Sequence, residues 1–288
     1  MEKDKSLAKK FYIDTFGCQM NKLDSELISE ILIAEGFEET RLLRESDIIL
    51  INSCSVRKHA EDRVYSRTGT LKFLKKRNPG LIIGIIGCMA EREKEKIFTR
   101  LPHVNLVCGP SNIAEITDLV NSLLEHEKGK TIVAIGGCGR HIERVHTISK
   151  KHLSGFISVV RGCDRFCSYC IVPYVRGRKV SREIEDVVHE AESLLRSGVK
   201  EITLLGQDIN SYHTSAGKKF PELLQNISPL PGLVRLRFIT SHPASVDRQL
   251  FEAMRDLHNV CAYLHLPAQS GSDKILKDMN RGYTRDEF

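Results

Sequence analysis

Short apolar runs alternate with helical patterns along the first half of the chain. Runs rich in β-branched and other apolar residues predict five strands, at residues 11–15, 47–51, 81–86, 104–107 and 131–135. Between the first two, residues 24–35 carry apolar side chains at helical spacing and are followed by Gly36, a residue typical of helix ends. Strands that alternate with helices are typical of a parallel sheet with crossover helices. We therefore expect an α/β domain over residues 1–140.

The pattern breaks at residues 138–151, which are rich in Gly, His and charged residues. We place a linker within this stretch, at 141–151. A second alternating series fills residues 152–288, with strands expected at 155–160, 200–205, 234–239 and 260–264 and helices at 181–196, 221–226, 246–256 and 273–279. Four strand–helix units are too few to close a barrel. We therefore expect an incomplete barrel in a chain that is shortened at its carboxyl end.

Composition and charge limit the class of protein only loosely. A chain of 288 residues, 41% of them hydrophobic, is long enough for two average domains. Its formal net charge of +6 permits a polyanionic partner without requiring one. The charged first ten residues lack the apolar core of a signal peptide, and the longest apolar run, 81–86, is too short to cross a bilayer. We expect a cytoplasmic protein with no membrane partner.

The spacing of the nine Cys residues does not resemble the disulfide framework of a small secreted domain. Five of them follow the ends of the predicted strands, namely Cys18, Cys54, Cys88, Cys108 and Cys138. Ligands of parallel sheets gather at the carboxyl ends of the strands, so several of these thiols are expected to meet. The alternative for each is a small buried hydrophobic residue. Gly17 and Gly87 precede two of them, and we expect the missing Cβ to let the backbone approach a bulky ligand.

Another three Cys residues follow the first strand of the second series. Cys163, Cys167 and Cys170 are separated by three and two residues, a spacing that lets three thiolates converge on one face of a loop. Cubane iron–sulfur clusters normally have four Cys ligands. Three Cys residues with no fourth nearby predict a cluster in which one iron stays open to another ligand. A zinc site and an inert electron-transfer cluster are the alternatives.

With the aromatic Tyr169 before its last Cys, this run resembles the C-x-x-x-C-x-aromatic-C loop of the radical S-adenosylmethionine enzymes. The resemblance implies that the three Cys residues hold a [4Fe-4S] cluster whose open iron chelates S-adenosylmethionine, and that a 5′-deoxyadenosyl radical is formed. It also implies that Tyr169 lies against the adenine of the cofactor. Gly206 and Gln207 stand where many relatives carry Gly-Gly-Glu, so their backbone carbonyls are the expected cofactor contacts. Residues 269–272 are a further candidate contact or a plain turn.

The amino-terminal half is similar to that of the methylthiotransferases, in the motifs Gly17-Cys-Gln-Met-Asn21, Asn52-Ser-Cys54 and Gly87-Cys88-Met-Ala90. The resemblance implies that Cys18, Cys54 and Cys88 hold a second [4Fe-4S] cluster, which handles the sulfur to be inserted. It assigns no ligand role to the remaining three, Cys108, Cys138 and Cys261.

Gln19 and Met20 replace the Pro and Lys of the branch that modifies a ribosomal protein, which favours the tRNA branch. That branch adds a methylthio group to carbon 2 of N6-isopentenyladenosine beside the anticodon. Three alternatives stay open: threonylcarbamoyl-adenosine in tRNA as the target, an aspartate of a ribosomal protein as the target, and a two-cluster electron carrier.

The implied partners are the tRNA anticodon stem-loop and a reducing electron donor such as flavodoxin or ferredoxin. Residues 161–182 include six basic residues and one acidic residue, which suits a cofactor carboxylate, tRNA phosphates or a solvated face. The small carboxyl-terminal β domain that helps this family to bind tRNA has no counterpart in the sequence. His242 and His265 are expected to be structural.

Overall fold

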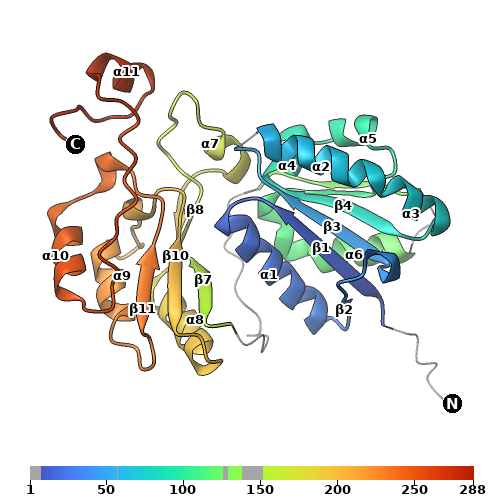
Figure 1. The fold of residues 1–288 in the computed structure, drawn as a ribbon, viewed down its shortest axis with the longest axis horizontal. Coiled ribbons are helices and arrows are strands. Elements are labelled where there is room, and N and C mark those ends of the chain that lie inside the picture. The colour runs from blue at the N-terminus through green and yellow to red at the C-terminus, as the bar shows by residue number, and fades with distance from the viewer. Residues whose placement is uncertain (1–7, 57, 126–128, 138–151) are drawn as a thin grey trace. The chain divides into compact units, whose positions relative to one another are not determined.

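A computed structural model describes residues 8–56, 58–125, 129–137 and 152–288, and these divide into two compact units (Figure 1). Unit 1 comprises the described residues up to 137, and unit 2 comprises residues 152–288. The predicted linker, 141–151, lies outside the described residues. Both units combine parallel strands with helices, so the predicted α/β class is confirmed. No helix of the described residues is long and apolar enough to cross a membrane.

Unit 1 is built on a parallel sheet with the strand order β2-β1-β3-β4-β5-β6. The strands are β1 (Lys10–Phe16), β2 (Glu38–Glu39), β3 (Ile48–Ser53), β4 (Ile82–Gly87), β5 (Leu106–Cys108) and β6 (Ile132–Ala134). All five predicted strands are confirmed, and β2 is an additional short strand at the edge. Every residue of β3 and β4 is buried, because helices cover both faces of the sheet.

The helices of unit 1 form two layers. They are α1 (Gln19–Ala34), α2 (Lys58–Thr70), α3 (Lys72–Arg77), α4 (Cys88–Glu93), α5 (Lys96–Arg100) and α6 (Ile116–Glu125), with short 3₁₀ turns at Leu43–Glu45 and Pro110–Glu115. In Figure 1, α2 to α5 lie along one face of the sheet and α1 lies with α6 along the other. Helix α1 begins earlier than predicted, because Cys18 caps it and the Asn21 side chain accepts the Cys18 backbone N–H at 3.3 Å.

Unit 2 contains a parallel sheet with the order β11-β10-β7 and a separate antiparallel pair, β8 with β9. The strands are β7 (Ser154–Ser158), β8 (Val160–Arg161), β9 (Val180–Ser181), β10 (Glu201–Leu205) and β11 (Arg235–Phe238). The helices are α7 (Val172–Arg176), α8 (Ile184–Arg196), α9 (Phe220–Ile227), α10 (Arg248–Asp256) and α11 (Asp273–Asp278), with 3₁₀ turns at Ile209–Ser211 and Pro243–Ser245. The four predicted helices, α8 to α11, are confirmed.

The core of unit 2 lies between the three-stranded sheet and the helices that follow its strands. Helix α8 buries Val187, Ala191 and Leu194, which its helical spacing places on one face, in the same core cluster as Ile202 and Leu204 of β10. Each fully buried aliphatic side chain of this kind contributes about 1.5–3 kcal/mol of hydrophobic stabilisation. Burial of this face therefore decides which way the helix packs.

The predicted strand at 260–264 is wrong. Only one bridge forms there, between Leu236 and Val260, in the described residues. The Cys261 N–H donates to the Leu236 carbonyl at 2.9 Å, but the Tyr263 N–H turns back to the Cys261 carbonyl at 2.7 Å. Since Tyr263 is also largely exposed, neither hydrogen bonding nor burial extends the ladder.

Candidate functional site

Three Cys residues follow neighbouring strands of unit 1. Cys18 comes two residues after β1, Cys54 directly follows β3, and Cys88 directly follows β4. The three strands are adjacent and parallel, so their carboxyl ends share one edge of the sheet. A hydrogen bond with Cys18, together with burial, holds the pKa of the Cys54 thiol well above its usual range, and the nearby Cys88 raises it further. The structure therefore brings these three predicted residues together.

Two buried amides support this set of thiols. Asn21 and Asn52 are completely buried, and Asn21 Nδ2 donates to Asn52 Oδ1 at 3.0 Å and to the Ser53 carbonyl at 3.2 Å. Asn21 Oδ1 accepts the Cys18 backbone N–H and lies 3.4 Å from the Cys18 thiol. Asn52 Nδ2 donates to the Asn21 carbonyl and to Ser25 Oγ, both at 2.9 Å. Because buried amides need such partners, the network ties the start of α1 to the end of β3.

The role of these two amides was not predicted from the sequence. A signal for Asn52 was present, because an Asn stands near the end of a strand, Ile48–Ser53, whose first four residues are apolar. A polar residue at a buried strand position requires hydrogen-bond partners from elsewhere in the fold. The identity of the partner, Asn21, does not follow from the sequence pattern.

Gly17 and Gly87 pack against the amide network. A Cβ on Gly17 would lie 2.3 Å from Asn21 Oδ1, and one on Gly87 would lie 2.5 Å from Asn52 Oδ1. Gly87 also has a φ of +89°, which L side chains rarely adopt. We expected these glycines to make room for a ligand. Their close neighbours in the structure are the two amides, and the approach of a ligand stays a prediction.

The remaining Cys residues are placed differently. Cys108 is the last residue of β5 and is completely buried, and burial raises the pKa of its thiol well above the usual range. It packs as a core residue. Cys261 is half-buried beside the bridge between Leu236 and Val260. Cys138, also predicted to follow a strand end, lies outside the described residues.

The second set of three Cys residues lies on one loop of unit 2. Cys163, Cys167 and Cys170 lie between β8 and α7, and the pairing of β8 with β9 closes the loop at its base. Gly162 has a φ of +77°, and a Cβ there would lie 2.1 Å from the Arg178 carbonyl. The two arms of the loop therefore approach too closely for a side chain at this position.

The thiols of this loop are held close together and shielded from water. Cys163 and Cys167 are buried, and Cys170 is half-buried. Burial raises the pKa of Cys163 to about 11 and raises the pKa of Cys170, and the neighbouring Cys residues add to both shifts. Thiols with raised pKa values must release protons when they ligate a metal.

Both sets supply sulfur ligands only, which fits an iron–sulfur cluster. Among the described residues, no three His, Cys, Asp or Glu side chains converge closely enough to hold a single metal ion. In a [4Fe-4S] cluster each Cys binds a different iron, so its ligands surround a larger volume than the ligands of one ion do. Three thiols in each set would leave one iron open in each cluster.

A segment far along the chain holds the second loop by its backbone. The Ser168 N–H donates to the Met279 carbonyl at 3.1 Å. Asn280 Nδ2 donates to the Phe166 carbonyl, 114 positions earlier, at 2.9 Å. Asn280 and Phe166 both have positive φ values, a conformation that Asn tolerates better than most residues. The loop geometry therefore depends on the residues that follow α11.

Arg281 brings a buried cation to the same loop. It is 5% exposed, and its Nη1 lies 3.3 Å from Cys167 Sγ and 3.3 Å from the Tyr169 hydroxyl. The hydrogen bonds and charges of Tyr283, Cys167 and Tyr169 raise the pKa of this guanidinium against the opposing effect of burial, so it stays charged. Sequence reasoning did not identify Arg281. Its contact to the loop is purely tertiary.

A carboxylate ties the loop to the ends of the neighbouring strands. Asp208 follows β10 and is 2% exposed, and its Oδ2 accepts Arg165 Nε at 3.1 Å and Ser245 Oγ at 2.7 Å. Arg165 also donates to Ser245. Gln207, beside it, accepts the Gly162 N–H with its side-chain oxygen at 2.6 Å. The Gln207 side chain is thus used to hold the loop.

Buried polar atoms mark the end of β11. Thr240 has a φ of +72°, which is rare for a β-branched residue and indicates local strain. Next to it, Ser241 Oγ and His242 Nε2 are buried without hydrogen-bond partners in the described part of the chain. Burial and the charges of Arg281 and Arg165 lower the pKa of His242 to about 3, so its ring is neutral. Unpartnered buried atoms at the carboxyl edge of a sheet are suited to a polar ligand.

Comparison with known families assigns both units. Residues 10–109 match the "Uncharacterized protein family UPF0004", and residues 157–288 match the "Radical SAM superfamily". Unit 2 is thus similar to the radical S-adenosylmethionine enzymes, the class that the spacing of its three-Cys loop predicts. This match supports S-adenosylmethionine and an iron–sulfur cluster as cofactors.

The chain resembles methylthiotransferases over nearly its whole length, as predicted. It is 43% identical, over 98% of its length, to a tRNA-2-methylthio-N(6)-dimethylallyladenosine synthase of Citrifermentans bemidjiense, and 41% identical, over 97%, to that of Geotalea uraniireducens. It spans 64% of the length of each of these relatives.

A solved structure shares the fold. The radical S-adenosylmethionine methyltransferase TsrM of Kitasatospora setae aligns with a TM-score of 0.65 over 97% of this chain and 64% of its own, at 15% identity. At this level of identity the likeness concerns the fold alone. It agrees with the α/β architecture of the two units.

Proposed function

We propose that the protein transfers a methylthio group to carbon 2 of N6-isopentenyladenosine beside the anticodon of tRNA, using S-adenosylmethionine and two [4Fe-4S] clusters. One observation carries the proposal: the chain joins a three-Cys loop in a radical S-adenosylmethionine domain to a second, separate set of three Cys residues. Radical formation alone needs one cluster, so the second set implies an additional chemical role. Relatives that are 43% identical carry the name of this activity.

Cys18, Cys54 and Cys88 would hold the first cluster, and Cys163, Cys167 and Cys170 the second. When bound, the second cluster would supply the electron that cleaves S-adenosylmethionine, and the first would carry the sulfur to be inserted. The exposed Cys18 leaves one side of the first set accessible. Arg281 would donate its Nη1–H to the Cys167 sulfur and balance part of the thiolate charge.

The residues around the second loop would orient S-adenosylmethionine. The Tyr169 ring is 52% exposed and is available to pack against the adenine. Because the Gln207 side chain already accepts the Gly162 N–H, the backbone carbonyls of Gly206 and Gln207 remain the groups for the cofactor amine. The buried Ser241 hydroxyl and the neutral His242 ring add polar atoms at the same sheet edge.

Two partners follow from this activity. The substrate would be the anticodon stem-loop of a tRNA, and the net charge of +6 is compatible with a polyanion. The electron would come from a low-potential donor such as flavodoxin or ferredoxin.

Cluster stoichiometry tests the two-cluster part of the proposal. The chain is reconstituted anaerobically with iron and sulfide, and both are quantified per polypeptide. We expect about eight irons, the sum for two [4Fe-4S] clusters. A value near four would contradict the assignment of the two Cys sets.

Product analysis tests the reaction. The reduced, reconstituted protein is incubated with S-adenosylmethionine and isopentenylated tRNA, and nucleosides are analysed by mass spectrometry. We expect 2-methylthio-N6-isopentenyladenosine together with 5′-deoxyadenosine. Methylthiolation of a ribosomal protein but not of tRNA would refute the substrate, and clusters without any 5′-deoxyadenosine would indicate an electron carrier.

A further inference from the structure

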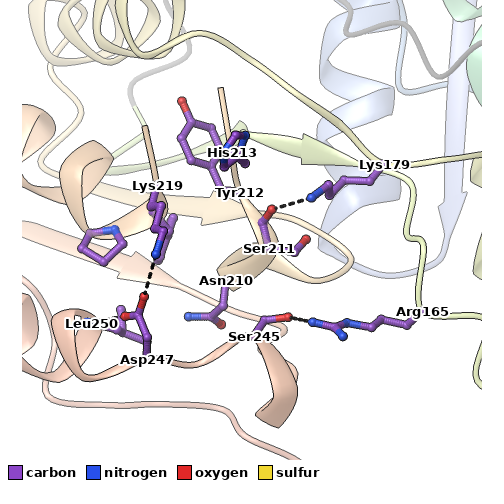
Figure 2. Close-up of a pocket in the computed structure, with 12 residues that line it drawn as sticks. Arg165, Lys179, Asn210, Ser211, Tyr212, His213, Lys219, Ser245, Asp247 and Leu250 are labelled. Carbon is purple, nitrogen blue, oxygen red and sulfur yellow. Dashed lines mark hydrogen bonds and ion pairs between the residues drawn. The ribbon is translucent and has the colours of Figure 1, made fainter. Parts of the chain in front are cut away.

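Unit 2 has a cavity with polar and apolar walls beside the loop that carries its Cys residues. The cavity has a volume of about 310 Å³ and is lined by the segment that follows β10, the start of α9 and the start of α10. Arg165 and Lys179, from the two arms of the Cys loop, complete its wall. Figure 2 shows Lys179 and Lys219 on opposite sides of the lining residues, with the Lys179 ammonium directed at Ser211 and the Lys219 ammonium at Asp247.

The lining carries three cations and one carboxylate. The charge of Arg165 is balanced by the buried Asp208, at 3.1 Å. Lys219 Nζ lies 3.7 Å from Asp247 Oδ2, and both side chains are partly exposed, so this pair is weak. Lys179 Nζ donates to the Ser211 carbonyl at 2.8 Å, and no carboxylate of the described residues pairs with it. The cavity therefore has an excess of positive charge, centred on Lys179.

We propose that this cavity binds a backbone phosphate of the RNA substrate. The inference rests on the proposed function and adds a specific anchoring site to it. An ammonium held by a neutral carbonyl keeps its full charge for an anion, and a second ammonium lies across the cavity. The Asn210 amide lines the same space and supplies a hydrogen-bond donor for a phosphate. Ser211 Oγ, which donates its proton to the Asp208 carbonyl at 2.7 Å, can still accept from a sugar hydroxyl.

The position of the cavity connects this anchor to the reaction. Arg165 lies two residues after Cys163 and lines the cavity, while its Nε bonds to Asp208. A phosphate bound against Lys179 and Lys219 would hold the RNA strand next to the loop that binds the catalytic cluster. Such a contact fixes position and contributes no base specificity.

RNA binding by lysine variants tests the site. The probe is an anticodon stem-loop RNA that contains N6-isopentenyladenosine, titrated against the reconstituted protein at several salt concentrations. We expect Lys179→Gln and Lys219→Gln each to weaken binding roughly fivefold and to reduce the slope of log affinity against log salt by about one. Lys218→Gln is the matched control, because Lys218 is paired with Glu222 at 2.8 Å and does not line the cavity.

A substitution that should increase RNA affinity distinguishes a phosphate site from a general loss of structure. Asp247→Asn keeps a side chain that can cap α10 but removes the carboxylate beside Lys219, so RNA should bind more tightly. Asp256→Asn is the control for loss of one negative charge, because Asp256 is paired with Arg255 on the same helix outside this cavity. Tighter binding by the first variant and not by the second supports the anchor.

The outcomes distinguish this inference from the proposed function. The anchor is overturned if the three cavity variants have normal iron content and circular dichroism and bind the RNA as tightly as the wild type. These variants are Lys179→Gln, Lys219→Gln and Asp247→Asn. The proposed function would still stand. Failure of the wild-type protein to bind the RNA overturns the RNA substrate itself. Competition by inorganic phosphate alone, with no effect of the variants on RNA affinity, shows an anion site that RNA does not use and also rejects the proposal.

Discussion

The two sets of Cys residues are built in opposite ways. In unit 1 the three thiols come from the ends of three adjacent strands, and a buried amide network between Asn21 and Asn52 supports them. In unit 2 the three thiols lie within eight consecutive residues, and contacts from residues 279–281 hold the loop. The first set depends on the core of its unit, whereas the second depends on a few long-range hydrogen bonds and one buried cation.

This difference determines how each set responds to change. A thiol at a strand end moves only if the sheet moves, so substitutions near it act through the stability of unit 1. A thiol on a loop keeps its sequence neighbours even when the loop shifts, so substitutions near it act on local geometry and electrostatics.

Removing one thiol from either set should separate the two roles completely. Cys167→Ala should retain about four irons and form no 5′-deoxyadenosine, whereas Cys88→Ala should also retain about four irons but still form 5′-deoxyadenosine. Iron analysis and chromatography of the reduced, S-adenosylmethionine-treated proteins provide the measurement. If Cys88→Ala also stops 5′-deoxyadenosine formation, the two sets are not independent.

Adding a methyl group at the end of β4 should destabilise unit 1 strongly. Gly87→Ala places a Cβ 2.5 Å from Asn52 Oδ1 at a φ of +89°, and we expect a loss of about 3 kcal/mol in the free energy of unfolding. Gly36→Ala is the control, because Gly36 has a φ of +87° with no atom near the new Cβ. Its loss should be about 1 kcal/mol. Urea denaturation followed by circular dichroism measures both, and equal losses would show that the close contact does not matter.

Truncating the amide network should have a smaller effect of the same kind. Asn52→Ala leaves the buried Asn21 amide without one partner, which we expect to cost about 1–3 kcal/mol of stability. The same variant should lose iron from the first set and keep 5′-deoxyadenosine formation by the second. A normal iron content after reconstitution would argue that the network is not needed to align the thiols.

Changing the buried cation of unit 2 should alter redox properties with little change in stability. Removing a charge-assisted hydrogen bond to a ligating sulfur favours the oxidised cluster, so Arg281→Met should lower the reduction potential of the second cluster. Arg281→Lys keeps the charge, so its reduction potential should lie between those of the wild type and Arg281→Met. A redox titration followed by electron paramagnetic resonance in a Cys88→Ala background reports this cluster alone. An unchanged potential in Arg281→Met would mean that Arg281 has only a packing role.

Much of the fold was predictable because the periodicity of apolar residues is strong. Five of the strands of unit 1 and the helices α8 to α11 of unit 2 were predicted within a few residues. The strand expected at 260–264 failed because its apolar pattern is not matched by burial: Tyr263 is 55% exposed and its N–H turns back to Cys261. A pattern of apolar residues shows that a strand is possible. The strand forms only where its backbone pairs with a neighbouring strand and its side chains are buried.

The Cys residues were identified from sequence because their spacing and their strand-end positions are local properties. The residues that support them were not. Asn21 and Asn52 are 31 positions apart, and Arg281 is 114 positions from Cys167. A side chain that acts by meeting a partner from elsewhere in the fold leaves no periodic signal in the sequence.

Residue type, spacing and the alternation of strands with helices were enough to predict the α/β class and to pick out the two sets of thiols. Only the tertiary structure decided that Gly17 and Gly87 accommodate buried amides, that Arg281 contacts Cys167, and that Lys179 and Lys219 line one cavity. The physical reason is that hydrogen bonds and charges act over a few ångströms in space, and chain folding, not sequence separation, sets those distances.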